Sequence, residues 1–182
     1  MARLSKEDWL AEGFKILSEF AQDKLRILYL CERLKVTRGS FYHHFTSIDN
    51  YVEALMEKWE QDNTRYFILK ADQKESPDER MEVLNQLVLK GDQSIEAAIR
   101  SWGFYQPTVK GYLERVDQTR LAYLTDIFAG KGYDKKEAVI MAELEYAILI
   151  GAQQLFPGKF GRRVSDIYKK YGQLVENDLK RE

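Results

Sequence analysis

Apolar residues recur at intervals of three and four along almost the whole chain, and this periodicity constrains the fold more than any other feature. Side chains at these intervals share one face of an α-helix, whereas a half-buried strand requires alternation with a period of two. The first apolar stripe begins at Leu10 and continues through Phe14 and Leu17 to Ala21. Period-two alternation is almost absent. The chain is therefore predicted to be all-α.

Capping residues and prolines divide the periodic sequence into separate helices. Ser5 with Asp8 resembles a capping box, and the next three helix starts are predicted at Asp23, Thr37 and Ser47. Pro77, Pro107 and Pro157 mark later breaks. The second, third and fourth helices are expected to end near residues 34, 44 and 71, and later helices are expected at 77–90, 92–104, 107–130, 134–156 and 161–180. Three short helices and one long helix therefore precede a larger helical body.

Cysteine content and hydropathy indicate the cellular compartment. Cys31 is the one cysteine of the chain, which excludes an internal disulfide and favours the reducing cytoplasm. It is expected on the core side of the second helix. The N-terminus lacks the apolar region of a signal peptide. The most apolar stretch, residues 138–152, contains Glu143 and Glu145 and is shorter than the roughly 20 residues that span a bilayer. We therefore expect a cytoplasmic protein with no membrane association.

Charge is distributed unevenly along the chain. The formal net charge is −1, yet residues 24–46 carry five basic side chains and one acidic side chain, a local charge of +4. The 20 basic and 23 acidic side chains from residue 47 onward give −3. A basic pole on an otherwise acidic protein indicates a localised anion-binding surface.

Within this pole, residues 36–45 read VTRGSFYHHF and have two different faces. Phe41 and Phe45 are four residues apart, so they share one face of a helix and, with Val36, can anchor it on the two preceding helices. A helix this short is stable only when tertiary contacts hold it. The opposite face then carries Arg38, Ser40, Tyr42 and His43. Because a helix and a tight turn precede it, the stretch is predicted to complete a helix-turn-helix.

A helix presented in this way fits the major groove of duplex DNA. Arg38 can donate a bidentate pair of hydrogen bonds to guanine O6 and N7, and Thr37 and Ser40 can bond a base edge or a phosphate. Gly39 lacks a side chain at a point where DNA would approach closely. The alternative interpretation is a plain helical hairpin with a solvated polar face.

The segment LYLCERLKVTRGSFYHHFTSIDNYVEALMEKW, residues 28–59, resembles the DNA-binding module of the tetracycline-repressor (TetR) family of transcriptional regulators. The matching motifs are residues 30–33, 36–37 and 39–45 and the serine that begins the fourth helix, and the order of helix lengths also agrees. The rest of the chain is similar to the family's second domain only in being helical and of suitable length. The resemblance implies an N-terminal three-helix helix-turn-helix DNA-binding domain at residues 1–47 and a C-terminal helical effector-binding and dimerisation domain at residues 48–182.

The resemblance also assigns DNA contacts to Thr37, Arg38, Ser40, Tyr42 and His43, with Tyr42 on a phosphate. Three positions depart from the family pattern. Lys35 stands where the turn usually has glycine, which implies either a left-handed lysine or a slightly different turn. Ile48 replaces a phosphate-binding lysine at the start of the fourth helix. Arg26 stands where the second helix often opens with threonine, and it is expected to supply the phosphate contact instead. The full predicted DNA interface is Arg26, Lys35, Thr37, Arg38, Gly39, Ser40, Tyr42, His43 and His44.

The helical body is rich in aromatic residues at helical spacing, and most are expected in the core. The family resemblance places a small-molecule pocket among helices four to seven. Arg120 lies on an otherwise apolar helix face, and Glu145 also interrupts an apolar run. Because a buried charge needs a partner, they form either a structural Arg120–Glu145 ion pair or part of an anionic-effector site. The predicted effector residues are Trp59, Tyr66, Trp102, Tyr105, Tyr112, Arg120 and Tyr123.

The last two predicted helices carry more apolar surface than one layer can bury, together with small residues that permit close helix approach. This surface is either internal core or the isologous interface of a homodimer joined as a four-helix bundle. A two-fold dimer would place two recognition helices in successive major grooves of palindromic DNA. The candidate interface residues are Ala147, Ile150, Gly151, Leu155, Ile167, Tyr171 and Leu174.

Signatures of catalysis and metal binding are absent from the sequence. His43 and His44 are adjacent, so they diverge on a helix and cannot chelate one metal ion together. No nucleophile or phosphate-binding loop is recognisable, so no enzyme activity, metal or cofactor is expected. The sequence and its family resemblance predict a homodimeric, ligand-responsive transcriptional repressor that binds palindromic double-stranded DNA. Two alternatives are a helical small-molecule enzyme or carrier without DNA binding, and a regulator controlled by a protein partner.

Overall fold

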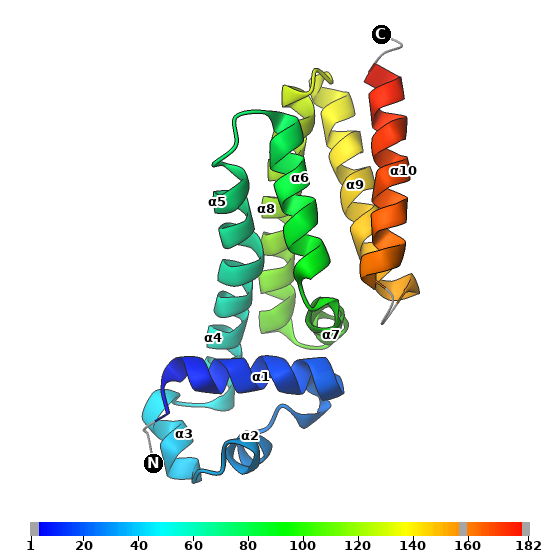
Figure 1. Ribbon diagram of the computed structural model, residues 1–182. Helices are drawn as coiled ribbons and strands as arrows, with labels where there is room; N and C mark the ends of the chain where they lie inside the picture. The colour runs from blue at the N-terminus through cyan, green and yellow to red at the C-terminus, as the bar shows by residue number, and fades with distance from the viewer. Residues whose placement is uncertain (1–3, 157–159, 180–182) are drawn as a thin grey trace. The chain divides into compact units, whose positions relative to one another are not determined.

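The computed structural model describes residues 4–156 and 160–179, and every regular element in this part is a helix (Figure 1). The N-terminal elements are α1 (Lys6–Phe20), the 3-10 turn η1 (Ala21–Lys24), α2 (Ile27–Leu34), α3 (Arg38–His44) and α4 (Ile48–Glu60). The later elements are the π-helical turn η2 (Gln61–Arg65), α5 (Tyr66–Ala71), α6 (Pro77–Lys90), α7 (Gln93–Gly103), α8 (Pro107–Gly130), α9 (Lys135–Leu155) and α10 (Phe160–Leu179). The all-α prediction is confirmed.

Two of the four predicted N-terminal caps are confirmed. The Ser5 hydroxyl accepts the Asp8 backbone N–H while the Asp8 carboxylate accepts the Ser5 backbone N–H, which completes the capping box of α1. The Ser47 hydroxyl accepts the Asn50 backbone N–H at 3.1 Å and caps α4. These bonds satisfy backbone donors that lack a partner within the first helical turn.

The other two predicted caps are wrong. Asp23 does not cap α2, because the chain forms the 3-10 turn η1 there and the helix begins only at Ile27. Thr37 occupies the N-cap position of α3, but its side chain makes no capping hydrogen bond. The Thr37 backbone carbonyl instead accepts the N–H of Ser40 at 3.0 Å. The Thr37 hydroxyl therefore makes no capping hydrogen bond to the backbone of α3.

The long fourth helix is helical to Ala71, as predicted, but it contains one irregular turn. Residues Gln61–Arg65 form the π-helical turn η2 between α4 and α5. Such wider turns are rare and interrupt the regular hydrogen-bond ladder of an α-helix. The predicted helix is thus two α-helical segments joined by η2.

The chain divides into two compact units. Unit 1 comprises Met1–Asn63 and Ser94–Val116, and unit 2 comprises Thr64–Gln93 and Asp117–Glu182. Unit 1 thus combines the first four α-helices with α7 and the start of α8. The domain boundary predicted at residue 47 separates a DNA-binding domain from an effector-binding and dimerisation domain. This division by function remains a prediction.

The core of unit 1 joins the helix-turn-helix to α1, α4, α7 and α8. Cys31 is a free thiol in this core, as expected, and burial raises the pKa of that thiol. The largest side chains are almost inaccessible to solvent and come from five of these helices: Trp9, Leu30, Phe41, Tyr51, Trp59 and Ile99. The helix-turn-helix is therefore packed on one continuous core.

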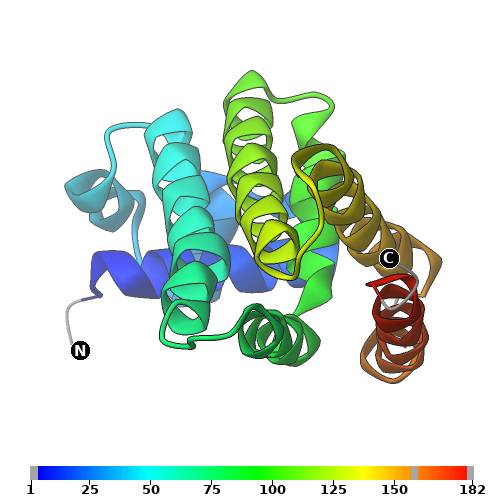
Figure 2. The ribbon, with the colours of Figure 1, turned by 90° about the horizontal axis from the view of Figure 1, so that it is seen from above.

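Unit 2 is built from α5, α6, the second part of α8, α9 and α10. Figure 2 shows α6 beside α5 and α10 beside α9. Among the described helices, α9 alone is long and apolar enough to cross a bilayer on length and composition. Its Ala138, Ala142 and Leu149 are buried in the core of unit 2, as in the central helix of a globular domain.

A close approach between α1 and α4 gives a test of the packing in unit 1. The buried Tyr51 hydroxyl donates to the Trp9 carbonyl oxygen at 2.8 Å, and a Cβ at Gly13 would lie only 2.0 Å from that hydroxyl. We expect Gly13→Ala to lower the free energy of unfolding by about 1–3 kcal/mol, because it displaces the ring and breaks this hydrogen bond. Urea denaturation followed by circular dichroism measures the change.

Gly111→Ala is the matched control for this substitution. Gly111 lies within α8, and a Cβ there would meet no atom within 4 Å. Replacing glycine by alanine in an unobstructed helix raises stability by up to about 1 kcal/mol. Equal stability of Gly13→Ala and the wild-type protein would contradict the proposed packing.

Candidate nucleic-acid interface

The turn between α2 and α3 is a Schellman motif built around a lysine. Lys35 has φ 56° and ψ 45°, in the left-handed region. Its backbone N–H donates to the Glu32 carbonyl at 3.1 Å, and the Val36 N–H donates to the Cys31 carbonyl at 2.9 Å. The left-handed lysine that the sequence offered as one of two possibilities is therefore present, and it costs roughly 1 kcal/mol relative to glycine.

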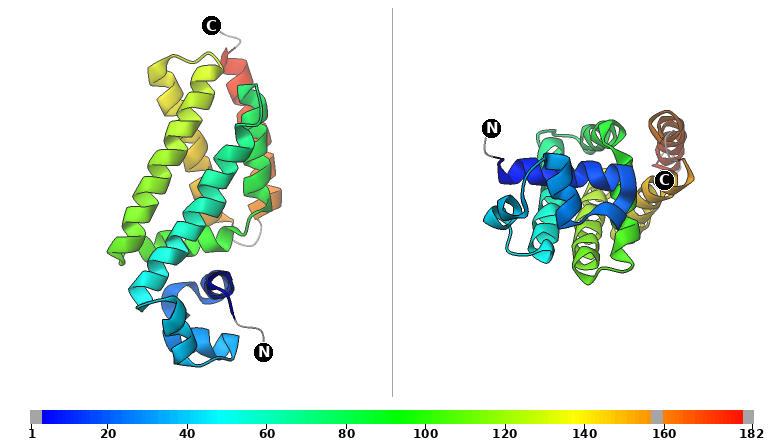
Figure 3. Two further views of the ribbon diagram at one scale, coloured as in Figure 1. Left: turned by 90° about the vertical axis from the view of Figure 1, so that its left-hand side faces the viewer. Right: turned by 90° about the horizontal axis from the view of Figure 1, so that it is seen from below.

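Aromatic packing holds α3 from behind, as the spacing of its phenylalanines predicts. Phe41 and Phe45 are 0% and 1% exposed. The Phe41 ring packs edge-on against Trp9 with centroids 5.4 Å apart, and Phe45 packs edge-on against Tyr51 at 4.9 Å. Figure 3 shows α2 and α3 on the same side of α1. The apolar face of α3 is thus fixed on α1 and α4.

The opposite face of α3 is turned to solvent. Tyr42 is 48% exposed, and His43 is also exposed. Ser40 and His44 are half-buried, and the His44 ring lies 6.4 Å from Trp9 between centroids. The remaining predicted DNA contacts are all exposed: Arg26, Lys35, Thr37, Arg38 and Gly39. Each of the nine predicted contacts is therefore at least partly accessible to solvent, and a role in DNA binding remains a prediction for all of them.

Gly39 has room for a side-chain carbon in the free protein. A Cβ at this position would meet only the Thr37 hydroxyl oxygen, at an ordinary distance of 3.6 Å. Packing within the chain therefore does not require glycine here. Close approach of DNA, the predicted reason for glycine at this position, remains a prediction.

One of the five cations in the basic pole is neutralised by α1. Arg33 Nε lies 2.7 Å from a Glu12 oxygen, and its two terminal nitrogens bind the Glu19 carboxylate at 2.6 and 3.1 Å. Hydrogen bonds from Arg33 lower the pKa of Glu19. The local charge of residues 24–46 does not include these two partners, because they lie 14 and 21 residues before Arg33 in the sequence. Within the described residues the other four cations make no ion pair: Lys24, Arg26, Lys35 and Arg38.

The predicted effector residues are spread over both units. In unit 1, Trp59 is a core residue, Tyr105 is 81% exposed, and Trp102 and Tyr112 are half-buried. The Arg115 guanidinium covers the Tyr112 ring at 4.3 Å from its centroid and pairs with the buried carboxylate of Glu60. In unit 2 lie the exposed Tyr66 and the half-buried Arg120 and Tyr123. A role in effector binding remains a prediction for each of them.

Of the two interpretations of Arg120 and Glu145, the structural ion pair between them is wrong. Arg120 Nε donates to the Thr64 hydroxyl at 3.0 Å, and another guanidinium nitrogen donates to the Tyr146 hydroxyl at 3.1 Å. Tyr146 in turn donates to an Asp117 oxygen at 2.6 Å. Consecutive side chains on a helix diverge by about 100°, so Tyr146 meets Arg120 while Glu145 faces elsewhere.

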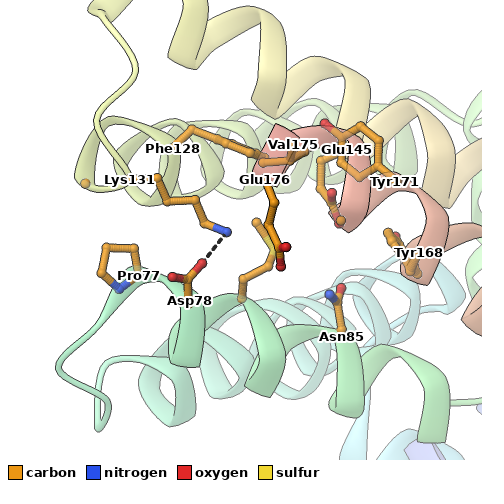
Figure 4. Close-up of a pocket in the computed structure, with 13 residues that line it drawn as sticks. Pro77, Asp78, Asn85, Phe128, Lys131, Glu145, Tyr168, Tyr171, Val175 and Glu176 are labelled. Atoms are coloured by element: carbon orange, nitrogen blue, oxygen red, sulfur yellow. Dashed lines mark ion pairs between the residues drawn. The ribbon is translucent and has the colours of Figure 1, made fainter. Parts of the chain in front are cut away.

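Glu145 lines a cavity of about 540 Å³ within unit 2 (Figure 4). The cavity lies between α6, the end of α8, α9 and α10, and none of the predicted effector residues lines it. Tyr171, predicted at the dimer interface, is part of its wall. The sequence signalled Glu145 as a charge on an apolar helix, but the cavity depends on how four helices pack.

The candidate dimer residues lie on α9 and α10 and are only partly covered by the chain itself. Leu155 and Leu174 are 72% and 56% exposed, and Ala147 is also exposed. The other four are half-buried: Ile150, Gly151, Ile167 and Tyr171. Val139, Ile140 and Leu144, which are not among the predicted interface residues, are also large apolar side chains exposed on α9.

No family model and no curated protein matches the sequence. Solved structures match along nearly the whole chain. A TetR-family transcriptional regulator from Streptomyces coelicolor superposes with a TM-score of 0.77 at 16% identity and covers 96% of this chain and 95% of its own. A transcriptional regulator from Rhodococcus sp. Rha1 gives 0.75 at 18% identity, with 96% and 97% covered.

A third similar structure is that of a transcriptional regulator from Saccharomonospora viridis in complex with choline. Its TM-score is 0.73 at 17% identity, and 94% of this chain and 95% of that chain are covered. At such identities the likeness defines the fold. The protein has the fold of the TetR-family transcriptional regulators, as its resemblance to that family implies.

The left-handed lysine of the turn gives a test of the interface geometry. We expect Lys35→Gly to be about 1 kcal/mol more stable than Lys35→Ala, because both remove the charge and only glycine relieves the strained backbone. Chemical denaturation of the two variants measures the difference. Equal stabilities would show that residue 35 is not left-handed in solution.

Proposed function

We propose that the chain is a cytoplasmic transcriptional repressor of the TetR type. It binds palindromic operator DNA as a homodimer, and a small-molecule effector modulates that binding. The observation that carries the proposal is the two-faced recognition helix α3, whose phenylalanines are buried while its polar side chains are exposed.

The chemistry of the exposed face suits duplex DNA. Arg38 begins α3, is exposed and has no ion-pair partner among the described residues, so its guanidinium is available to guanine O6 and N7. The hydroxyls of Thr37 and Tyr42 supply donors for phosphate or base edges. Arg26 and Lys35 add positive charge for the phosphate backbone.

The exposed apolar side chains of α9 support a homodimer. Ile140, Leu144, Gly151 and Leu155 recur at intervals that keep them on one helical face. Leu174 adds a further exposed apolar side chain on the adjacent α10. Two copies of α9 and α10 would form an isologous four-helix interface. A dimer of this kind presents two recognition helices to half-sites about 34 Å apart.

Effector control requires a ligand that distinguishes two states of the protein. The effector must bind the DNA-incompetent state more tightly, and the shift cannot exceed the difference between its two affinities. The choline complex of the Saccharomonospora viridis regulator supports the capacity of this fold to hold a small molecule. The cavity beside Glu145 offers such a ligand about 540 Å³.

Substitutions at the start of α3 test the DNA contacts. We expect Arg38→Ala to weaken binding by about 1–3 kcal/mol on a duplex that the wild-type protein selects from a random pool, because the bidentate donor is lost. We expect Gly39→Ala to weaken DNA binding without loss of thermal stability, since its Cβ would make only an ordinary contact, with the Thr37 hydroxyl oxygen at 3.6 Å. Fluorescence anisotropy with labelled duplex measures both affinities.

Lys90→Ala is the control, because it removes an exposed cation from α6, outside the proposed interface. Its DNA affinity should equal that of the wild-type protein. If Arg38→Ala and Gly39→Ala also bind as the wild type does, the proposed use of α3 is wrong.

A charged residue on the apolar face of α9 tests the homodimer. We expect the wild-type protein to be a dimer in light scattering after size exclusion, and Leu144→Glu to shift it to the monomer because a buried carboxylate would lack a partner. Leu69→Glu on α5 is the control, since Leu69 is also exposed but lies outside the proposed interface. A wild-type monomer, or a Leu144→Glu dimer as stable as the control, would contradict the proposal.

A further inference from the structure

The cavity of unit 2 is lined by both apolar and polar side chains. Met81, Phe128 and Val175 are buried side chains that contribute to its apolar lining. Asn85, Tyr168 and Tyr171 contribute amide and aromatic groups from α6 and α10. Figure 4 shows the Glu145 carboxylate directed into this space from α9. Concave apolar sites with a few converging polar groups are the usual form of small-molecule sites.

Glu145 differs from the other buried glutamates of the described residues. Each of the other three pairs with an arginine: Glu12 with Arg33, Glu60 with Arg115 and Glu96 with Arg100. Glu145 is equally buried, at 5% exposure, yet it makes no hydrogen bond or ion pair within residues 4–156 and 160–179. A buried carboxylate without a partner is costly, and burial raises the pKa of Glu145 to about 7. Among the described residues, Glu145 is thus a buried glutamate without an arginine partner, and it lines a cavity.

The positive charge of Lys131 partly offsets the effect of burial on the pKa of Glu145, but Lys131 forms no ion pair with that carboxylate. Lys131 contributes the one ammonium group in the wall, and its nitrogen lies 2.7 Å from an Asp78 oxygen. Glu176 adds a third carboxylate beside Asp78 and Glu145. The wall thus holds three acidic side chains and one basic side chain, which favours a positively charged occupant.

We propose that this cavity binds an organic ammonium ion, whose charged nitrogen lies at Glu145 and whose apolar body lies along Met81, Phe128 and Val175. The nitrogen–hydrogen donors satisfy the carboxylate, and the nearby tyrosine rings attract organic cations. A bare metal ion fits less well, because no three histidine, cysteine, aspartate or glutamate side chains among the described residues are placed to hold one metal ion together. The cavity volume also far exceeds that of an ion.

The inference rests on the proposed function only where it makes this ligand the effector; the site itself is tested without DNA. Failure of the cation assay would leave the operator-binding proposal intact. Failure of the DNA assay would equally leave the cation site intact. The two outcomes are therefore distinguishable.

The ionised form of Glu145 is the form that holds the ammonium group, so binding strengthens as pH rises. With a pKa of about 7, the ionised fraction rises about tenfold between about pH 6 and about pH 8, and the association constant should follow it. The groups that face Glu145 across the cavity are Asp78 and Asn85 on α6, Lys131 after α8, and Tyr168, Tyr171 and Glu176 on α10.

Isothermal titration calorimetry of the full chain with phenethylammonium and n-hexylammonium chlorides at about pH 8 tests the proposal. We expect saturable binding of one amine per chain and no saturable binding of the neutral isosteres 2-phenylethanol and 1-hexanol. Glu145→Gln should bind the amines at least about tenfold more weakly, because it keeps the shape and removes the charge. Glu143→Gln, an exposed neighbour on the same helix, should bind as the wild type does.

Three results would overturn the proposal. These are equal affinity of Glu145→Gln and the wild type, equal affinity for amines and alcohols, and no saturation by either amine at about 10 mM. Glu145→Gln should fold, since it removes a charge whose burial is unfavourable. If Glu145→Gln does not fold, the pH dependence of amine binding by the wild-type protein is the test. Binding that is independent of pH between about 6 and 8 would overturn the proposal.

Discussion

The burial of Phe41 and Phe45 against Trp9 and Tyr51 is the interaction on which the rest of the structure depends. Helix α3 has only 7 residues, and a helix of that length does not persist in water without tertiary contacts. Because these rings fix one face of α3, its other face must point to solvent. Gly13 on α1 also contributes to this packing, because its lack of a side chain leaves room for the Tyr51 ring. DNA recognition by this chain would thus begin with an apolar contact inside the protein.

Most helix boundaries could be predicted from the sequence, because they depend on residues close together in the chain. Contacts between helices that are distant in the sequence could not be predicted in this way. Pro77 and Pro107 begin α6 and α8 as predicted, because proline tolerates the first helical turn. The cap at Asp23 failed because the chain formed a 3-10 turn there. The ion pairs of Arg33 and the hydrogen bonds of Arg120 depend on how helices are rotated against each other. The same holds for the cavity, of which the sequence revealed only the unusual position of Glu145.

The buried glutamates of the described residues differ in whether an arginine compensates their charge. The buried carboxylate of Glu60 on α4 pairs with Arg115 on α8, so its charge is compensated within the chain. Glu145 has no such partner within the described residues, and its charge remains available in a cavity lined from four helices. Helix α8 contributes Val109 to the core of unit 1 and Phe128 to this cavity. A ligand beside Phe128 would therefore touch a helix that also belongs to the core behind α3.

Selection of bound sequences from a random duplex pool by the purified protein tests the central claim most directly. If the exposed face of α3 reads DNA in a two-fold dimer, the pool should converge on an inverted repeat whose half-sites lie about one helical turn apart. Affinity for that repeat should fall steeply and log-linearly with salt, as neutralised phosphates release their counterions. A pool that stays random, or a binding constant that does not change with salt, would contradict the account.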